Sequence, residues 1–597
     1  MCGIVACCSP RPATEYLLPA LRRLEYRGYD SAGIAVLTGG AGVRRLRSVG
    51  RIAALADLAG NESAEEFTGV GIGHTRWATH GFVTEANAHP HIDCAGAVHV
   101  VHNGIIDNAA ELRAELTLQG HRIQTDVDSE VLAHVVEDEL RTGVDLLDAV
   151  QKAVARLTGS WALAVVCRGL PSVVVTAHGS PLVIAHTESG TFAASDMTAL
   201  AGRADAVQVL QDGDFAELHH GGIRWKRADG SHTTPPLVPL NLCGADVELG
   251  GAPDFMAKEI AEQPATIGAV VDRMADGIAD GSLWTSLHLP VLSRVRFVAC
   301  GTSLNAAAVL ARLLAQWGVP ASLAPASELD GVVVEPHTLT VALSQSGETA
   351  DVLRALDGAA GRTSPLLALT NAPHSTLGRS ADALVDLQVG PEIGVAATKT
   401  FTAQVAAGAA VLLSGLVCAG RLDHDRAAEL ADELRRLPAQ LTQATRLAHA
   451  HVAGVAADLA DAPGFLYVAR GVGVPYAAEG ALKLKEITYR WAECHAAGEL
   501  KHGPIALIGS GTPVVVIDDG HPKLAANVAE MAARRARIIT VGGDRSTLPY
   551  RREPAPDVPW GPLPAVVTLQ HLAREIAVHL GRDVDKPRNL AKSVTVE

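Results

Sequence analysis

Residues 294–314 read RVRFVACGTSLNAAAVLARLL, in which an apolar strand pattern, a glycine-containing turn and an Ala/Leu-rich helix pattern follow one another. The same order returns in residues 464–484, GFLYVARGVGVPYAAEGALKL. Apolar runs short enough for strands alternate with long helical patterns throughout this half of the chain, which is typical of parallel α/β layering. We therefore predict two similar doubly wound α/β subdomains, at residues 285–425 and 455–590.

Proline and glycine gather upstream of this repeat, in residues 231–253 (SHTTPPLVPLNLCGADVELGGAP), where hydrophobic periodicity is lost. Such a composition is expected of a linker between domains. We place an N-terminal domain at residues 1–240 and a linker with a helical connection at residues 241–284. The length of 597 residues supports this division, because single hydrophobic cores stop growing near ~250 to 300 residues.

The N-terminal domain has the pattern of a strand-rich fold. Apolar or alternating runs such as VGIGHT (70–75), AVHVVHNGII (97–106) and WALAVVCRG (161–169) are bounded by Gly, Asn and Pro. A helical pattern, SEVLAHVVEDELR (129–141), lies between them. The sequence therefore predicts a mixed α+β domain with packed sheets.

The amino-acid composition of the chain excludes several classes of binding partner. The formal net charge of -15 argues against nucleic acid, whose binding proteins concentrate Lys and Arg. Nine scattered cysteines without a C-x-x-C pair indicate neither a zinc site nor a disulfide framework, and a cytoplasmic location fits them best. The start MCGIVACCSPRP lacks the pattern of a signal peptide, and the uncharged stretch 405–420 is shorter than the ~20 residues of a membrane span. We expect no metal, redox cofactor or membrane contact, and a buried helix at 405–420.

Cys2 directly follows the initiator methionine. Removal of Met1 would expose a thiol beside a free α-amino group, and a proton passes easily between groups with pKa values of ~8.5 and ~7.7 to 8.0. Cys2 would then be a nucleophile that carries its own base. The alternative is one more small hydrophobic residue among the nine cysteines.

Two further N-terminal motifs place polar residues where strand patterns end or break. HTRWATHG (74–81) contains Arg76, which is suited to clamp a carboxylate, and Asp128 follows in TDVDSE, where it is suited to pair with an ammonium. Asn103-Gly104 interrupts another apolar run. An Asn amide and a Gly N–H aimed at one point would form an oxyanion hole, whereas a plain turn is the alternative.

With MCGIV, LRRLEYRGYDSAG and NAHPH, these motifs resemble the N-terminal-nucleophile class of glutamine amidotransferases. The resemblance implies the sandwich fold of that class and L-glutamine as substrate. It implies that Cys2 attacks the glutamine amide and that Asn103 and Gly104 form the oxyanion hole. The glutamine-binding residues that it implies are Arg76, Trp77, Thr79, His80 and Asp128, with Asp126 as the alternative to Asp128. Ala6 departs from the Gly that is usual in this class.

In the C-terminal half, two apolar strand patterns run into loops of small hydroxyl residues, VACGTS (298–303) and VALSQSGET (341–349). Backbone N–H groups at a helix start and Ser or Thr hydroxyls together bind phosphate, although ordinary helix caps use the same residues. Two such loops favour a phosphate site over ordinary capping. The candidate residues are Thr302, Ser303, Ser344, Gln345, Ser346 and Thr349.

Four charged or titratable residues follow downstream. Lys483 and Glu486 lie three apart on one helix face, where a surface ion pair is the alternative to a catalytic pair. His502 lies in the Gly/Pro-flanked loop AAGELKHGP, and Lys592 lies in the C-terminal tail, residues 586–597.

These segments, with GVAATKTF and DKPRNLAKSVTVE, resemble the sugar isomerase (SIS) module. An amidotransferase domain followed by two such modules is similar to the glutamine:fructose-6-phosphate amidotransferase family, over essentially the whole chain. The resemblance implies that the hydroxyl loops hold the phosphate of D-fructose 6-phosphate, His502 assists ring opening, and Lys592 forms a Schiff base at C2. Glu486, helped by Lys483, would move a proton between C1 and C2. It also implies an internal ammonia passage gated by Trp77, and a homodimer.

Two alternatives remain at this stage. One is a paralogue that acts on another phosphosugar, and the other is a regulatory protein that binds sugar phosphate without turnover. The second class usually lacks the Glu, His and terminal Lys, and all three are present here. Leu304 and His495 depart from the aromatic residue and the Tyr that the family often has, and neither has a role in the expected chemistry.

Overall fold

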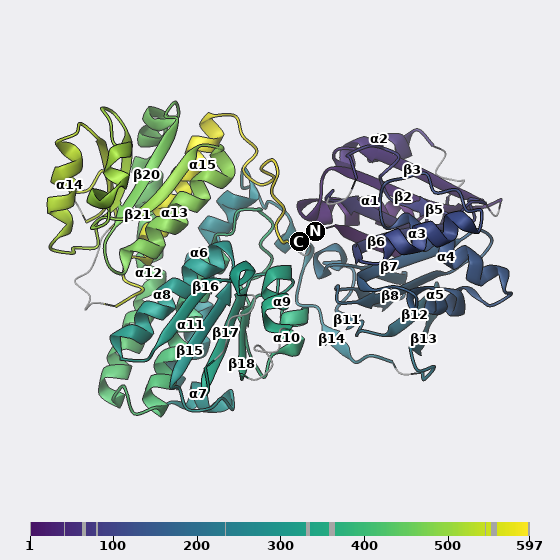
Figure 1. Ribbon diagram of the computed structural model, residues 1–597, viewed down its shortest axis with the longest axis horizontal. Helices are drawn as coiled ribbons and strands as arrows, with labels where there is room; N and C mark the ends of the chain where they lie inside the picture. Colours follow the sequence, from purple (N-terminus) through teal and green to yellow (C-terminus); the bar gives the residue numbers. More distant parts are fainter. Residues whose placement is uncertain are drawn as a thin grey trace. The chain divides into compact units, whose positions relative to one another are not determined.

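The chain divides into two units in the computed structural model, which describes residues 2–40, 42–62, 67–78, 81–232, 234–329, 335–357, 364–543, 545–550 and 558–594. The first unit joins Met1–Glu248 with Ala591–Glu597, and the second is Leu249–Leu590. Figure 1 labels their helices and strands.

Two antiparallel sheets form the centre of the first unit. Among the described residues, one sheet has the order β14-β11-β9-β10-β1-β4-β2-β3 and the other the order β13-β12-β8-β7-β6-β5. In chain order the strands are β1 (Gly3–Cys8), β2 (Ser31–Thr38), β3 (Val43–Val49), β4 (Phe67–Arg76), β5 (His91–Ile92), β6 (Val98–Ile106), β7 (Gly159–Cys167), β8 (Val173–His178), β9 (Val183–Thr187), β10 (Gly190–Ala194), β11 (Ala206–Val209), β12 (Asp214–His219), β13 (Gly222–Arg227) and β14 (Leu237–Pro239).

Side chains along β1 alternate between two buried layers. Ile4 and Ala6 pack into the core between the two sheets, while Val5 and Cys7 face the helices outside. Both faces of each sheet are therefore covered, and the first unit is the predicted sandwich. Its helices are α1 (Thr14–Leu24) and α2 (Ile52–Gly60) on the first sheet, and α3 (Ala109–Leu118), α4 (Glu130–Arg141) and α5 (Leu146–Val154) on the second.

The second unit contains two parallel sheets of the same topology. Their orders are β16-β15-β17-β18-β19 and β21-β20-β22-β23-β24, so the first strand of each lies between the second and the third. The predicted pair of doubly wound α/β subdomains is confirmed. The strands are β15 (Arg294–Ala299), β16 (Ala321–Pro325), β17 (Thr338–Ser344), β18 (Leu366–Thr370), β19 (Ala383–Asp386), β20 (Gly464–Ala469), β21 (Trp491–Ala496), β22 (Pro513–Ile517), β23 (Arg537–Gly542) and β24 (Leu548–Pro549).

Helices pack on these sheets and join them through one continuous buried cluster. The helices of the second unit are α6 (Phe255–Met274), α7 (Ser282–Ser286), α8 (Gly301–Gln316), α9 (Ala350–Asp357), α10 (Thr376–Ser380), α11 (Lys399–Cys418), α12 (His424–Leu459), α13 (Gly473–Thr488), α14 (Leu524–Ala532) and α15 (Leu563–His579). Helix α11 is long and apolar enough to cross a membrane, but 89% of its most apolar window is buried inside the protein. It packs closely on α8, since a Cβ at Gly408 would lie 2.4 Å from Leu310. The buried helix predicted near residues 405–420 is therefore a core helix of the second unit.

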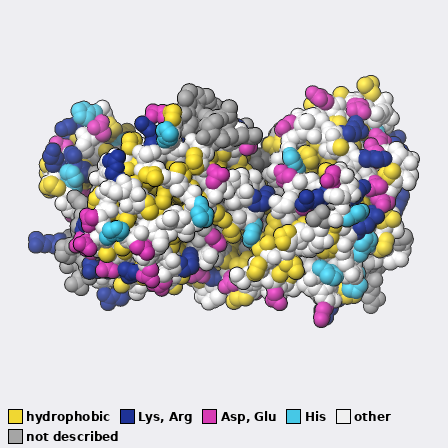
Figure 2. Space-filling view, turned by 90° about the horizontal axis from the view of Figure 1, so that it is seen from below, with side chains coloured by type: hydrophobic (Ala, Val, Ile, Leu, Met, Phe, Trp, Pro, Cys, Tyr) yellow, Lys and Arg dark blue, Asp and Glu magenta, His cyan; other side chains and the backbone are white. Residues whose placement is uncertain are grey.

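Charges of both signs are mixed on the surface. On the face drawn in Figure 2, Lys and Arg side chains of the described residues lie interspersed with Asp and Glu. The whole sequence carries a formal net charge of -15.

Candidate active sites

The thiol of Cys2 lies at the entrance of β1, against the segment that follows β4. The backbone N–H of Trp77 donates to Sγ across 3.3 Å, and Sγ lies 3.6 Å from the Trp77 carbonyl oxygen. Burial raises the pKa of the Cys2 thiol, while the amino-terminal charge, the Trp77 N–H and the guanidinium groups of Arg76 and Arg27 act to lower it. Burial outweighs these groups, so the pKa of the Cys2 thiol lies above its ordinary value and the sulfur rests as a thiol.

The side-chain amide of Asn103 is held with its NH2 group toward Cys2. Its Nδ2 donates to the Cys2 carbonyl oxygen (3.1 Å), and its Oδ1 lies 3.1 Å from Nε2 of His74. Burial lowers the pKa of His74 to about 3, so this imidazole is neutral. Nε2 also faces the carbonyl oxygen of His102 at 3.0 Å. Because both neighbours of Nε2 are acceptors, Nε2 carries the hydrogen, which fixes the orientation of the Asn103 amide.

Gly104 occupies a position that a side chain cannot share. Asn103 and Gly104 pair with Ala162 and Trp161 within the β6–β7 ladder, so the plain turn that was the alternative is not formed. The φ of Gly104 is +125°, and a Cβ there would lie 2.1 Å from the carbonyl oxygen of Ser160. Glycine is required by the backbone itself, next to the amide that faces Cys2.

The guanidinium of Arg76 interacts electrostatically with Cys2 and with Asp128. Arg76 is 3% exposed and its guanidinium donates weakly to the carbonyl oxygens of Gly81 and Phe82, at 3.4 Å each. Burial lowers the pKa of Arg76, and Cys2, Asp30 and Asp128 oppose that shift. The Asp128 carboxylate accepts from the Ile106 N–H at 3.0 Å, two residues beyond Gly104. The structure therefore places Arg76 where it interacts electrostatically with both the Cys2 thiol and the Asp128 carboxylate.

The structure describes only some of the other residues that were predicted for this site. The Trp77 ring packs edge-on against Tyr29, with centroids 5.4 Å apart. The backbone N–H of Asp126 donates to Asn87 Oδ1 (3.3 Å), and the choice of Asp128 over Asp126 stays a prediction. Thr79 and His80 lie outside the described residues.

Three residues that support Cys2 or its neighbours were not predicted from the sequence, and they are Arg27, Asp196 and His74. Arg27 donates from Nε to the Cys2 carbonyl oxygen (3.2 Å) and pairs through Nη1 with Asp196 (2.7 Å). His74 orients Asn103 as described. The motif LRRLEYRGYDSAG contained Arg27, but a side chain that binds backbone leaves no spacing pattern to reveal its partner.

In the second unit, the two hydroxyl loops meet at one edge of a sheet. Val298 of β15 pairs with Ala342 of β17, so the loops after these strands lie side by side at the carboxyl edge. This is the point where connections diverge in a 2-1-3-4-5 sheet, the usual ligand site of such folds. The structure therefore brings together the six predicted phosphate ligands, which are Thr302, Ser303, Ser344, Gln345, Ser346 and Thr349.

The second loop is curled by its own hydroxyl groups. Ser344 Oγ accepts from the Gly347 N–H (3.0 Å) and shares a hydrogen bond with Thr349 Oγ1 (2.9 Å). Ser346 Oγ accepts from the N–H of Glu348 (3.2 Å). Gly347 has a φ of +65°, which permits the tight bend before α9.

The first loop is tied to its surroundings through two hydroxyl groups. Ser303 Oγ accepts from Nε2 of Gln404 at 3.0 Å. Thr302 Oγ1 donates to Glu479 of α13 at 3.0 Å, and Asn305 Nδ2 donates to the other oxygen of the same carboxylate at 2.8 Å. The start of α8 is therefore joined to the second subdomain, a link that sequence reasoning did not predict.

Lys483 belongs to a buried ion-pair triad. Its Nζ lies 2.6 Å from Glu486 and 3.6 Å from Glu479, and its side chain is 1% exposed. Burial lowers the pKa of Lys483, but Glu486 and Glu479 raise it by more, so the ammonium is retained. Burial raises the pKa of Glu479 against the influence of Lys483, Asn305 and Thr302. The alternative of a surface ion pair is wrong for Lys483, because the pair is closed from solvent on the lysine side.

His502 and Lys592 lie in two different segments, neither of which is part of α13. His502 lies in an exposed 3-10 turn (Leu500–His502), and among the described residues no hydrogen bond or ion pair joins its side chain to Lys483 or Glu486. Lys592 lies in the terminal segment that is grouped with the first unit. Their catalytic roles therefore stay predictions.

Comparisons with known proteins agree with both halves. The family model described as "Glutamine amidotransferase domain" matches residues 74–202, and the one described as "SIS domain" matches residues 291–414 and 458–546. The fold and the two sites thus define a glutamine amidotransferase joined to paired phosphosugar isomerase modules.

Relatives that match over the full length identify the family more specifically than the domain models do. The glutamine--fructose-6-phosphate aminotransferase [isomerizing] of Halobacterium salinarum is 42% identical over 611 residues, and that of Thermus thermophilus is 41% identical over 615 residues, each comparison covering 100% of both chains. The chain belongs to the glutamine--fructose-6-phosphate aminotransferase (isomerizing) family. The solved C-terminal domain of the glucosamine-fructose-6-phosphate aminotransferase from Francisella tularensis is 30% identical with a TM-score of 0.52, covering 57% of this chain and 99% of that chain.

Proposed function

We propose that this chain transfers the amide nitrogen of L-glutamine to D-fructose 6-phosphate, giving D-glucosamine 6-phosphate and L-glutamate, the first step of amino-sugar (UDP-GlcNAc) synthesis. The observation that supports the proposal is the sequence identity of 40 to 42% with relatives that carry the name of this activity, over 100% of the chain. Because that similarity covers both units, it includes the glutaminase and the isomerase together.

In the first unit, the Cys2 thiolate attacks the carbonyl carbon of the glutamine amide. The α-amine of Cys2, freed by removal of Met1, takes the thiol proton and passes it to the departing ammonia. The resulting glutamyl thioester is hydrolysed by water to glutamate and the free thiol. Asn103 Nδ2, already 3.1 Å from the Cys2 carbonyl oxygen, and the Gly104 N–H would hold the oxyanion. Arg76 and Asp128 would hold the carboxylate and the ammonium of glutamine.

In the second unit, the hydroxyl loops at the β15/β17 edge would hold the 6-phosphate. His502 would assist ring opening, and Lys592 would form a Schiff base at C2 of the open ketose. After ammonia displaces the Lys592 amine at C2, Glu486 would move a proton from C1 to C2, and the Lys483 Nζ, 2.6 Å away, would hold the Glu486 carboxylate in position. This chemistry needs no metal or redox cofactor.

Three further properties follow from the family and stay predictions. Ammonia released at Cys2 has to reach the sugar without protonation in solvent, and Trp77 is the candidate gate. A homodimer and a cytoplasmic location are expected.

The proposal is tested by incubating the purified chain with glutamine and a panel of ketose phosphates, and measuring glutamate and amino-sugar phosphate together. Formation of glucosamine 6-phosphate from fructose 6-phosphate in a 1:1 ratio with glutamate supports it. Amination of a different ketose phosphate would indicate the paralogue, and binding without turnover would indicate the regulatory protein. Mass spectrometry of the intact active chain should show that Met1 is absent.

A further inference from the structure

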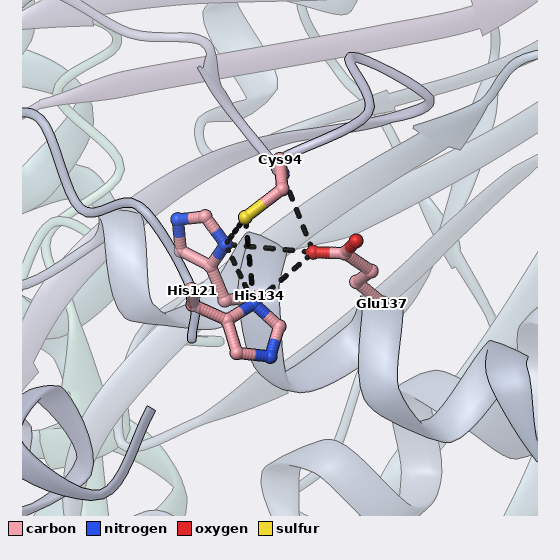
Figure 3. A group of neighbouring side chains, drawn as sticks. All are labelled: Cys94, His121, His134 and Glu137. Carbon is pink, nitrogen blue, oxygen red and sulfur yellow. Dashed lines mark hydrogen bonds and ion pairs between the residues drawn. The ribbon is translucent and has the colours of Figure 1, made fainter. Parts of the chain in front are cut away.

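Four side chains with metal-binding atoms converge in the first unit, outside the residues assigned above (Figure 3). Cys94 lies in the turn between β5 and β6, His121 follows α3, and His134 and Glu137 lie one helical turn apart on α4. The sulfur, one nitrogen of each imidazole and one carboxylate oxygen all lie within 4.8 Å of one another. The spacing of the residues in the sequence did not predict this cluster, because its members come from three separate segments.

The separations match those between ligands of a tetrahedral zinc ion. Bond lengths of about 2.3 Å for sulfur and about 2.0 to 2.2 Å for nitrogen and oxygen place tetrahedral ligand atoms about 3.3 to 3.6 Å apart. Cys94 Sγ lies 3.6 Å from His121 Nδ1 and 3.5 Å from His134 Nδ1, and the two Nδ1 atoms are 3.2 Å apart. Glu137 Oε2 lies 3.2 Å from His121 Nδ1 and 3.6 Å from His134 Nδ1.

A hydrogen bond on the outer side of the His121 ring leaves the lone pair of its other nitrogen facing the cluster. His121 Nε2 lies 2.9 Å from Asp138 Oδ1, an acceptor, so Nε2 carries the ring hydrogen and Nδ1 presents its lone pair to the cluster. His134 Nε2 lies 3.8 Å from the Glu130 carboxylate, a separation longer than a hydrogen bond. Lone pairs of two ring nitrogens and a carboxylate oxygen that meet at these distances repel one another unless a proton or a cation lies between them.

The donor set selects the kind of cation. Thiolate and imidazole favour zinc over magnesium or calcium, which prefer oxygen ligands. The backbone N–H of Arg122 donates to Cys94 Sγ at 3.3 Å, which helps to hold the sulfur in place beside the two imidazole rings. His121, His134 and Glu137 are buried while Cys94 is exposed, so an ion has a path from solvent.

We propose that Cys94, His121, His134 and Glu137 form a tetrahedral structural site for Zn²⁺. All four positions are filled by protein, which is the arrangement of structural rather than catalytic zinc. The ion would fasten the β5–β6 turn and the segment after α3 to α4. That segment leads into Thr125, whose backbone N–H is held by Glu130, and on to Asp128.

The test uses the full-length chain, stripped of metal with a chelator and titrated with Co²⁺. A tetrahedral site with one thiolate gives visible d–d bands and a near-ultraviolet sulfur-to-cobalt band that saturate at one equivalent per chain, and Zn²⁺ should bleach both. Cys94→Ser should lose the sulfur band. Cys2→Ala and Cys243→Ser, the second at another exposed cysteine, should keep it.

Thermal unfolding gives a second, independent measurement. Zinc in hundredfold excess over its dissociation constant should raise the melting temperature of the first unit by about 5 to 10 °C, and should not raise that of Cys94→Ser. A cobalt spectrum without a sulfur band, a band that survives Cys94→Ser, or the absence of stoichiometric binding by the unmodified chain would overturn the proposal and leave a hydrogen-bonded cluster. None of these readouts depends on the enzymatic activity.

Discussion

Replacement of Gly104 by alanine tests how the β6–β7 ladder builds the glutaminase site. The added Cβ would lie 2.1 Å from the Ser160 carbonyl oxygen, 2.7 Å from its carbon and 3.0 Å from the Trp161 Cα, all of which are backbone atoms. Relief to an ordinary contact near 3.4 Å requires the two strands to separate by about 1 Å. The φ of +125° adds about 1 to 3 kcal/mol of strain for a non-glycine residue.

Such a displacement moves the Gly104 N–H away from the developing oxyanion. Loss of one oxyanion-hole donor typically costs about 10²-fold to 10³-fold in kcat, and we expect Gly104→Ala to lose at least that much glutamate release. Conversion of fructose 6-phosphate to glucose 6-phosphate without glutamine should persist. Both rates are measured with coupled dehydrogenase assays, alongside thermal unfolding.

Gly169→Ala is the matched control. Gly169 also has a positive φ, +83°, but nothing lies within 4 Å of its added Cβ. It should share the conformational strain and keep glutaminase activity. Equal glutaminase rates in Gly104→Ala and the wild type, or equal losses in the two alanine variants, would refute the argument from close approach.

The remaining predictions concern the thiol, the triad and pH. Cys2→Ala should abolish glutamine hydrolysis and leave sugar isomerisation measurable, and equal loss of both activities would contradict separate sites. Glu479→Ala should destabilise the second unit by about 1 to 3 kcal/mol in urea unfolding, because Lys483 keeps Glu486 but Thr302 and Asn305 lose their buried acceptor. Glu479→Gln should be milder, since it keeps an oxygen for Thr302 or Asn305. Burial lowers the pKa of His74 and of His91 to about 3 each. The stability that these neutral imidazoles contribute is complete above pH ~6.5 and is lost as pH falls toward 3. Urea unfolding of the first unit should therefore show falling stability between pH 7 and 4, and a flat profile would contradict their burial as neutral groups.

Local patterns in the sequence were enough to predict much of the fold. The strand–glycine turn–helix pattern at residues 294–314 and its repeat correspond to β15–α8 and β20–α13. These elements were predictable because hydrophobic periodicity and glycine positions act within a few residues. The apolar runs of the N-terminal domain likewise lie in β4, β6 and β7.

Long-range polar contacts were not predictable in the same way. Glu479 joins Thr302 and Asn305 across more than 170 positions of sequence, and no local pattern records such a partner. Lys483 looked like half of a surface pair because α13 has charged residues, but its side chain faces the interior. The Cys94 cluster was missed for the same reason, since motif spacing detects only ligands that are close in sequence.

The central position of β1 has a consequence for biosynthesis. Its two partners in the sheet are β4 and β10, and the second of these ends at Ala194. At about 5 to 20 residues per second, the ribosome needs roughly 10 to 40 s to make that much chain. During this interval the start of the nascent polypeptide has no strand on its β10 side, so β1 and the Cys2 that precedes it take their final place only after Ala194 has been synthesised.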